Sequence, residues 1–268
     1  MSAQQDTSAL DAPRAAEAAG QGDPVMRLVD VKKSFGSQVV LNGLSFDVPR
    51  GQTLAIMGPS GTGKSVILRH LIGLMQPDGG RVEVEGHDMA RIGKKELAVL
   101  RRRMGFLFQE AALINWLSVG DNVALPLREN TRLKESEIKE RVSEKLDLVG
   151  VGGSWDKMPS QLSGGMKKRV GLARALITDP EIILYDEPNA GLVPEISASI
   201  NETIRELSER LQTTSVVVEH RIPCIKTVAD DVLFLNEGKV LLRLPPVEFF
   251  RSDHPRLVRF LGDLRDTA

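Results

Sequence analysis

The sequence predicts an α/β protein with a parallel core sheet, an antiparallel β-subdomain and an inserted α-helical subdomain. Strand-like and helix-like segments alternate over most of the chain, which is typical of a parallel sheet. Two early segments, 25–35 and 42–49, alternate apolar and polar residues as half-buried antiparallel strands do. Charged amphipathic helical patterns interrupt this order at about 111–175, so we interpret that stretch as the insert.

Each remaining element follows from its local pattern of apolar residues and its stop signals. In chain order we expect a strand at 52–58, a helix from Lys64 to Leu74, strands at 81–86 and 103–109, helices at 134–151 and 163–177, a strand at 181–188, a helix from about Glu195 to Leu211, a strand at 214–220 and a hairpin at 231–244 that turns at Asn236, Glu237 and Gly238.

Composition narrows the possible functions. The 268 residues are 41% hydrophobic, which is ample for a buried core. Lys plus Arg (35) nearly balances Asp plus Glu (36), and without a basic excess we expect no nucleic-acid partner. Cys224 is the only cysteine, so no intrachain disulfide can form, which suits a thiol-reducing compartment.

Membrane-spanning and export signals are not expected in this sequence. No apolar run approaches the roughly 20 residues that span a bilayer, and the N-terminal stretch lacks the apolar centre of a signal peptide. If the protein serves a membrane, we expect it to do so from the cytoplasmic side through a partner.

The stretch "GPSGTGKS" fits the phosphate-binding pattern G-x-x-x-x-G-K-[ST]. Glycines let successive N–H groups turn toward an anion, and the following helix adds its positive dipole end. An accidental match in a surface turn is the alternative, but the stretch lies between an apolar strand and an amphipathic helix, as a P-loop requires. We therefore expect nucleotide phosphates at Gly58, Pro59, Ser60, Gly61, Thr62, Gly63, Lys64 and Ser65, with Lys64 as the cation and the Ser65 hydroxyl as a Mg²⁺ ligand.

Two acids follow the apolar strand "IILY", namely Asp186 and Glu187. In P-loop enzymes an acid at this place supports Mg²⁺, and its neighbour can polarise an attacking water as a general base. Two solvated loop acids would be the simpler interpretation of "DEP" alone. The P-loop elsewhere in the chain favours the catalytic interpretation.

With these motifs in place, the chain resembles the ATP-binding subunit of ABC transporters over nearly its whole length. "LSGGM" at 162–166 looks like the ABC signature, Gln109 matches the Q-loop, Phe35 matches the aromatic residue that stacks on adenine, and His220 matches the switch histidine. Taken singly, the serine could be only a helix cap, and the phenylalanine or the histidine only structural. Five motifs in family order make the resemblance specific.

The resemblance implies ATP and Mg²⁺ as cofactors and a head-to-tail dimer of two copies. Ser163, Gly164 and Gly165 would contact the γ-phosphate held by the partner's P-loop, and His220 would sense that phosphate. Mg²⁺ would be held by Ser65, Gln109 and Asp186. The ABC ATPase domain would then span 25–244, between a tail at 1–24 whose Ala-, Ser-, Gln- and Asp-rich composition predicts flexibility and a C-terminal extension at 245–268 whose pattern predicts a helix.

The subfamily is indicated by Met166, where most ABC ATPases carry glutamine. "LSGGMKKRVGLARAL" is similar to the Mla/Mce-type lipid-transport ATPases. That resemblance implies an integral membrane permease, an MCE-domain lipid-binding protein and phospholipid substrates, with this chain peripheral on the cytoplasmic side of the inner membrane. The alternatives are an importer ATPase for amino acids or another small solute, a soluble ABC protein, and a regulator with negligible turnover.

Two positions depart from the family pattern. Val193 stands in "GLVP" where an acid is usual, and Arg221 follows the switch histidine where aspartate is frequent. Glu187 and His220 are kept, so we still predict hydrolysis, and Val193 bears on its rate and on the cooperativity between two sites. The basic runs at 94–95, 101–103 and 167–169 are interpreted mainly as solvated helix faces, while Trp116 and Trp155 fit either the insert or a permease contact.

Overall fold

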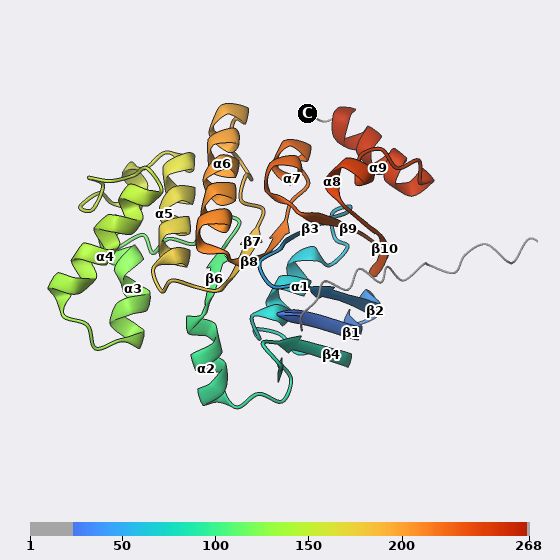
Figure 1. The fold of residues 1–268 in the computed structure, drawn as a ribbon, viewed down its shortest axis with the longest axis horizontal. Coiled ribbons are helices and arrows are strands. Elements are labelled where there is room, and N and C mark those ends of the chain that lie inside the picture. Colours follow the sequence, from blue (N-terminus) through green and yellow to red (C-terminus); the bar gives the residue numbers. More distant parts are fainter. Residues whose placement is uncertain (1–23, 267–268) are drawn as a thin grey trace, which may run out of the picture.

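The computed structural model describes residues 24–266 as two sheets with helices around them (Figure 1). The tail predicted at 1–24 therefore lies outside the described residues except for Pro24, as do the last two residues of the predicted extension. Within the described range, no helix is both long and apolar enough to cross a bilayer.

Among residues 24–266, the core sheet consists of six strands, in spatial order β10 (Lys239–Leu244), β9 (Asp231–Asn236), β3 (Thr53–Met57), β8 (Thr214–Val218), β7 (Ile182–Asp186) and β6 (Met104–Leu107). Every neighbouring pair is parallel except β10 with β9, which form the predicted hairpin. All five residues of β3 and of β8 are buried, as expected of central strands covered on both faces. The predicted parallel core is confirmed.

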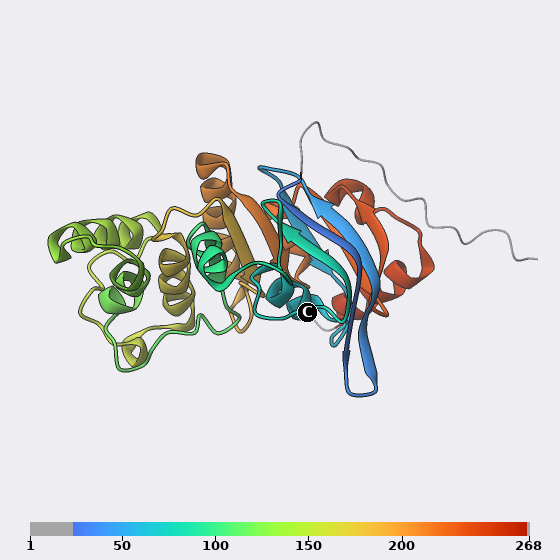
Figure 2. The same ribbon diagram turned by 90° about the horizontal axis from the view of Figure 1, so that it is seen from below.

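The second sheet is antiparallel, in the order β2 (Gln38–Val48), β1 (Met26–Phe35), β4 (Gly79–Val84) and β5 (His87–Asp88). Its inward side chains join the core cluster that also contains residues of β3, β7 and β8. Figure 2 shows the β1–β2 hairpin extending beyond the rest of this sheet. The predicted antiparallel subdomain is therefore confirmed, and its sheet packs directly on the core.

The helices of the predicted insert form a lobe at one end of the molecule (Figures 1 and 2). They are α3 (Val119–Asn130), α4 (Glu135–Leu148), the 3-10 turn η1 (Pro159–Gln161) and α5 (Gly164–Leu176). Helix α5 also packs on β6, so it joins the lobe to the core sheet. Trp155 packs in this lobe, whereas Trp116 is 81% exposed.

The other helices are α1 (Lys64–Leu71), α2 (Lys94–Arg102), α6 (Pro194–Leu211), α7 (Ile222–Val228), α8 (Pro246–Phe249) and α9 (Pro255–Asp266). The prediction that the first helix reaches Leu74 was wrong, because Gly73 adopts a φ of 71° and the chain turns away. Helices α8 and α9 cover β9 through Phe249 and Leu257, which share a cluster with Phe234. The domain boundaries drawn from the sequence stay predictions.

The basic runs are only partly solvated. Lys94 and Lys95 are exposed, as expected. The interpretation was wrong for Arg101, which donates to the carbonyls of Ile72 and Gly73 at 2.9 and 3.0 Å and so caps the end of α1. It was also wrong for Lys168, which is only 4% exposed.

Candidate functional site

The P-loop connects β3 to α1 and needs glycine at specific positions. Gly58 and Gly63 have φ values of 155° and 96°, which L side chains rarely adopt. A Cβ atom at Gly58 would lie 2.2 Å from the carbonyl oxygen of Leu235, and one at Gly63 would lie 2.8 Å from Leu41 and Val40. The loop therefore fits closely between β9 and β2 only as bare backbone.

Lys64 lies at the end of this loop and is 8% exposed. Its Nζ atom donates to the carbonyl oxygens of Gly58 and Pro59, each at 2.8 Å, and Thr62 closes the loop with a 2.9 Å bond to Pro59. Burial lowers the pKa of the Lys64 ammonium group, while Glu187 and Asp186 oppose that shift. Ser60 and Gly61 are exposed at the tip of the loop. A buried cation inside a ring of backbone groups suits phosphate binding.

Ser65 and Asp186 meet although 121 positions separate them in the sequence. The Ser65 hydroxyl donates to Oδ1 of Asp186 at 2.8 Å, at the end of β7. Burial raises the pKa of the Asp186 carboxyl, and the bond from Ser65 opposes the shift. Mg²⁺ prefers oxygen ligands, and a hydroxyl and a carboxylate side by side supply two of them, so Ser65 and Asp186 fit the ion. The described residues hold no cluster of three or more His, Cys, Asp or Glu side chains for a metal.

Glu187 is contacted from both sides. Gln109, which follows β6, donates its Nε2 to Glu187 Oε2 at 3.0 Å, and Nδ1 of His220 lies 4.0 Å from Glu187 Oε1. Glu187 also has a φ of 45°, a strained value of the kind found at functional sites. The fold thus brings Gln109, Glu187 and His220 together.

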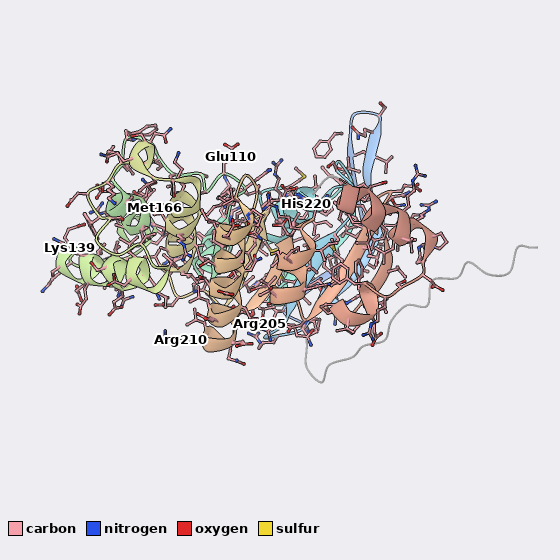
Figure 3. All side chains as sticks on the ribbon, turned by 90° about the horizontal axis from the view of Figure 1, so that it is seen from above. Glu110, Lys139, Met166, Arg205, Arg210 and His220 are labelled. Carbon is pink, nitrogen blue, oxygen red and sulfur yellow. The ribbon has the colours of Figure 1, made fainter. Side chains whose placement is uncertain are left out.

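The signature residues lie elsewhere. Ser163 caps α5 by accepting a 3.3 Å hydrogen bond from Met166, and both Ser163 and Gly164 are exposed. Gly165 is buried against Ile196 of α6. Figure 3 shows Met166 on the helical lobe and His220 on the core, well separated along the same face. The structure gives none of the three signature residues a contact with the P-loop of its own chain.

Phe35, the predicted adenine contact, ends β1 and is 47% exposed. The ammonium group of Lys33 lies 5.8 Å from its ring centroid. Phe35 pairs with Gln38 across the hairpin, two residues before Val40, which adjoins Gly63 of the P-loop. Phe35 thus lies on the hairpin whose second strand adjoins the phosphate loop.

A protein-family model described as ABC transporter matches residues 41–190, more than half of the chain. The chain belongs to the ABC transporter ATP-binding family. It is therefore an ABC ATPase, as the sequence predicted.

Several individual proteins resemble this ABC ATPase. A probable ribonucleotide transport ATP-binding protein, Mkl of Mycobacterium leprae, is 42% identical over 90% of this chain and 71% of its own length. The intermembrane phospholipid transport ATP-binding protein MlaF of Haemophilus influenzae is 39% identical, over 87% of this chain and 90% of its own. The methionine import ATP-binding protein MetN of Mesorhizobium japonicum is 38% identical, over 90% of this chain and 66% of its own length.

Solved structures agree with the fold. The ATP-binding cassette MJ0796, a dimer in a post-hydrolysis state with ADP and phosphate, superposes with a TM-score of 0.76. It is 31% identical and covers 82% of this chain and 98% of its own. Together with the family match, this likeness shows the predicted ABC-type fold.

Two residues of the ABC site were missed by sequence reasoning. Lys168 of α5 donates its Nζ to the backbone oxygen of Gln109 and, at 3.0 Å, to that of Glu187. Burial lowers the pKa of this lysine. Glu219 is fully buried directly before His220. A carboxylate at the end of an otherwise apolar strand was the available signal for Glu219, whereas nothing in "MKKR" distinguishes Lys168 from the basic residues beside it.

Proposed function

We propose that this ABC ATPase hydrolyses ATP to power the movement of phospholipids or related lipids through a partner permease in a bacterial envelope. The observation that carries hydrolysis is the convergence of Gln109, Glu187 and His220 beside the P-loop. The similarity to MlaF over most of both chains supports the lipid substrate.

Two copies arranged head to tail would complete each site. Ser163, Gly164 and Gly165 are presented at the N-terminus of α5, where a hydroxyl and backbone amides can bind a phosphate. Because no contact joins them to their own P-loop, they suit the γ-phosphate held by a second copy. The dimeric state of MJ0796 supports this arrangement.

In the reaction, Lys64 and the P-loop amides hold the β- and γ-phosphates. Glu187 accepts the proton of the attacking water, because its carboxylate faces the site and Gln109 fixes its orientation. His220 donates to the γ-phosphate, and Phe35 stacks on adenine. Mg²⁺, held by Ser65, Asp186 and Gln109, would neutralise charge on the phosphate oxygens when bound.

The permease contact is proposed near Gln109. A cleft of about 370 Å³ separates the core from the helical lobe and is lined by residues of α2, β6, α3 and α5, including Phe106 and Pro126. Just after β6, Phe108 and Trp116 are 40% and 81% exposed. Exposed apolar patches mark partner surfaces, and we propose that Trp116 belongs to one that contacts the permease, with the chain peripheral on the cytoplasmic side of the inner membrane. An MCE-domain protein would belong to the same complex.

Glu187→Gln tests hydrolysis. The amide keeps the shape of the side chain but cannot accept the proton, so turnover should fall at least about a hundredfold while ATP binding persists. ATP-loaded dimers should accumulate, as measured by light scattering after gel filtration. Undiminished phosphate release would remove Glu187 as the base, and a strictly monomeric ATP-loaded variant within its membrane complex would remove the shared site.

The second candidate is an importer ATPase for amino acids or another small solute, which the similarity to MetN favours. A gentle pull-down from membranes, with mass spectrometry of the copurified permease and of extracted lipid, separates the two. Bound phospholipid and an MCE-domain protein support lipid transport. A solute-binding protein without lipid supports import.

A further inference from the structure

The two residues that flank His220 both bind the segment 189–197 of the same chain. Oε2 of Glu219 accepts a hydrogen bond from the backbone N–H of Asn189 at 3.3 Å. Nη1 of Arg221 donates to the carbonyl oxygen of Leu192 and to the hydroxyl of Ser197, each at 2.9 Å. The loop 189–193 is thus held near both of its ends by the neighbours of His220.

Glu219 also holds the histidine itself. Its Oε1 atom accepts from the backbone N–H groups of His220 and Arg221 at 2.9 and 3.2 Å and lies 3.5 Å from Nδ1 of the His220 ring. One carboxylate oxygen of Glu219 therefore accepts hydrogen bonds from His220 and Arg221, and the other accepts one from Asn189. Because Glu219 is fully buried, water cannot replace these donors at low cost.

The loop itself offers no charge for this task. Val193, at the position where the sequence pattern expects an acid, is 55% exposed and begins α6 without a side-chain cap. Asn189 is tied to Asn201 of α6 by a 2.7 Å side-chain bond, and the Leu192 side chain is buried. The polar links between this loop and the segment 219–222, which contains His220, are therefore made by Glu219 and Arg221.

We propose that Glu219 and Arg221 are positioning residues that hold His220 and the loop 189–193 as one unit within a single chain. Displacement of the loop would then displace the histidine, so its approach to the γ-phosphate depends on the loop. The inference rests on the proposed function, because His220 must face the nucleotide for its position to affect turnover.

The contacts are tested first without any turnover. In nucleotide-free protein, Arg221→Met should speed hydrogen–deuterium exchange at least about threefold in peptides covering 189–197 and 219–222 together, because both segments lose the same link. Arg210→Met is the matched control, an exposed arginine at the far end of α6 (Figure 3), and should leave both segments unchanged. Unchanged exchange in Arg221→Met, or a change in one segment alone, overturns the proposal.

Ser197→Ala is the second variant, in case loss of Arg221 prevents folding. It removes one of the two acceptors of Nη1 and leaves the arginine in place. Its exchange should rise in the same two segments, by less than in Arg221→Met. An effect confined to 189–197 would show that the two segments are not joined.

Measurements of ATP turnover then test whether the position of His220 depends on these contacts. Glu219→Gln keeps one acceptor oxygen and turns an NH₂ group toward an N–H donor, so one of the two links is lost. We expect kcat to fall about tenfold with KM for ATP within about twofold, since binding groups are untouched. Arg221→Lys should recover part of the turnover that Arg221→Met loses. A lowered affinity at unchanged kcat overturns the positioning role.

Failure of the inference and failure of the proposed function give different results. If wild-type protein hydrolyses ATP and Glu187→Gln does not, while Glu219 and Arg221 variants behave as wild type in exchange and turnover, only the inference fails. If wild-type protein does not hydrolyse ATP, the proposed function fails, and the exchange experiment still decides whether the two segments are linked.

Discussion

The two halves of the candidate ATP site differ in how complete they are within one chain. On the core side, Lys64 is buried and bonded to its own loop, and Ser65, Asp186 and Glu187 have partners. On the lobe side, Ser163 and Gly164 are exposed, and α5 offers its N-terminus to solvent. One half is therefore preorganised by folding, whereas the other, under the proposed function, needs a second molecule to complete it.

Lys64→Ala tests the preorganised half and should have the largest effect. Removing the buried cation takes away the charge that faces the phosphates, so affinity for ATP should fall at least about a hundredfold. Equilibrium binding of a fluorescent ATP analogue measures it. Lys95→Ala, on the exposed face of α2, is the control and should bind as wild type. Retained affinity in Lys64→Ala would show that the loop does not bind the phosphates.

Ser163→Arg tests the exposed half. A bulky cation at the start of α5 should block a facing chain, so turnover should drop about a hundredfold, while each single chain still binds ATP with wild-type affinity. Light scattering of the variant combined with Glu187→Gln should show monomers. If nucleotide-loaded dimers still form, Ser163 does not lie in the interface between two copies.

Lys168→Met asks whether the lobe orients the core half. Its ammonium group joins α5 to the backbone carbonyl oxygens of Gln109 and Glu187, so its loss should loosen both residues. We expect kcat to decrease about tenfold with little change in KM. Lys167→Met, half exposed on the same helix, is the control. Equal kcat values for the two variants would limit Lys168 to a role in folding.

The smallest effect is expected on the stability of nucleotide-free protein carrying Asp186→Asn, where the Mg²⁺ that Asp186 is proposed to hold takes no part. Burial raises the pKa of Asp186 above its ordinary value of 3.8, so the folded chain binds that proton more tightly than the unfolded chain. The free energy of unfolding therefore falls as pH rises through the raised pKa. In nucleotide-free protein at pH 7, the asparagine should raise Tm by a few degrees, and the gain should vanish below about pH 4.

Scanning calorimetry from pH 4 to pH 8 checks this stability prediction. The exposed Asp156→Asn is the control and should show no such gain at pH 7. A gain that is independent of pH would mean that the amide stabilises by packing and that the charge of Asp186 costs nothing.

Much of the core half could be predicted because its motifs are contiguous in the chain. Residues 58–65 carry their own geometry, since the glycines and the lysine that are predicted to contact one anion are neighbours in the chain. The strands were predictable for a similar reason, because "LAIM" and "SVVV" are buried on both faces and contain almost no polar residue. Leu74 was misplaced in a helix because apolar spacing continues beyond the turn that Gly73 makes.

Contacts between distant segments could not be predicted in this way. Arg101 was taken for a surface residue, yet it donates to the carbonyl oxygen of Ile72, 29 positions earlier and directly after α1. In the sequence Lys168 looks like the basic residues on either side of it; only the packing of α5 against β6 turns its ammonium group toward Glu187. In the sequence, Arg221 was noted only because it departs from the family pattern after the histidine. Its two acceptors, on Leu192 and Ser197, lie in a different part of the chain.

The sequence by itself determined the chemistry of this protein: a phosphate loop, two acids, a glutamine, a histidine and a signature helix in the order of an ABC ATPase. Only the tertiary structure decided which of these groups meet within one chain and which are left facing outward. The physical reason is that local pattern encodes backbone conformation and burial, whereas the partners of a long polar side chain depend on how separate elements pack.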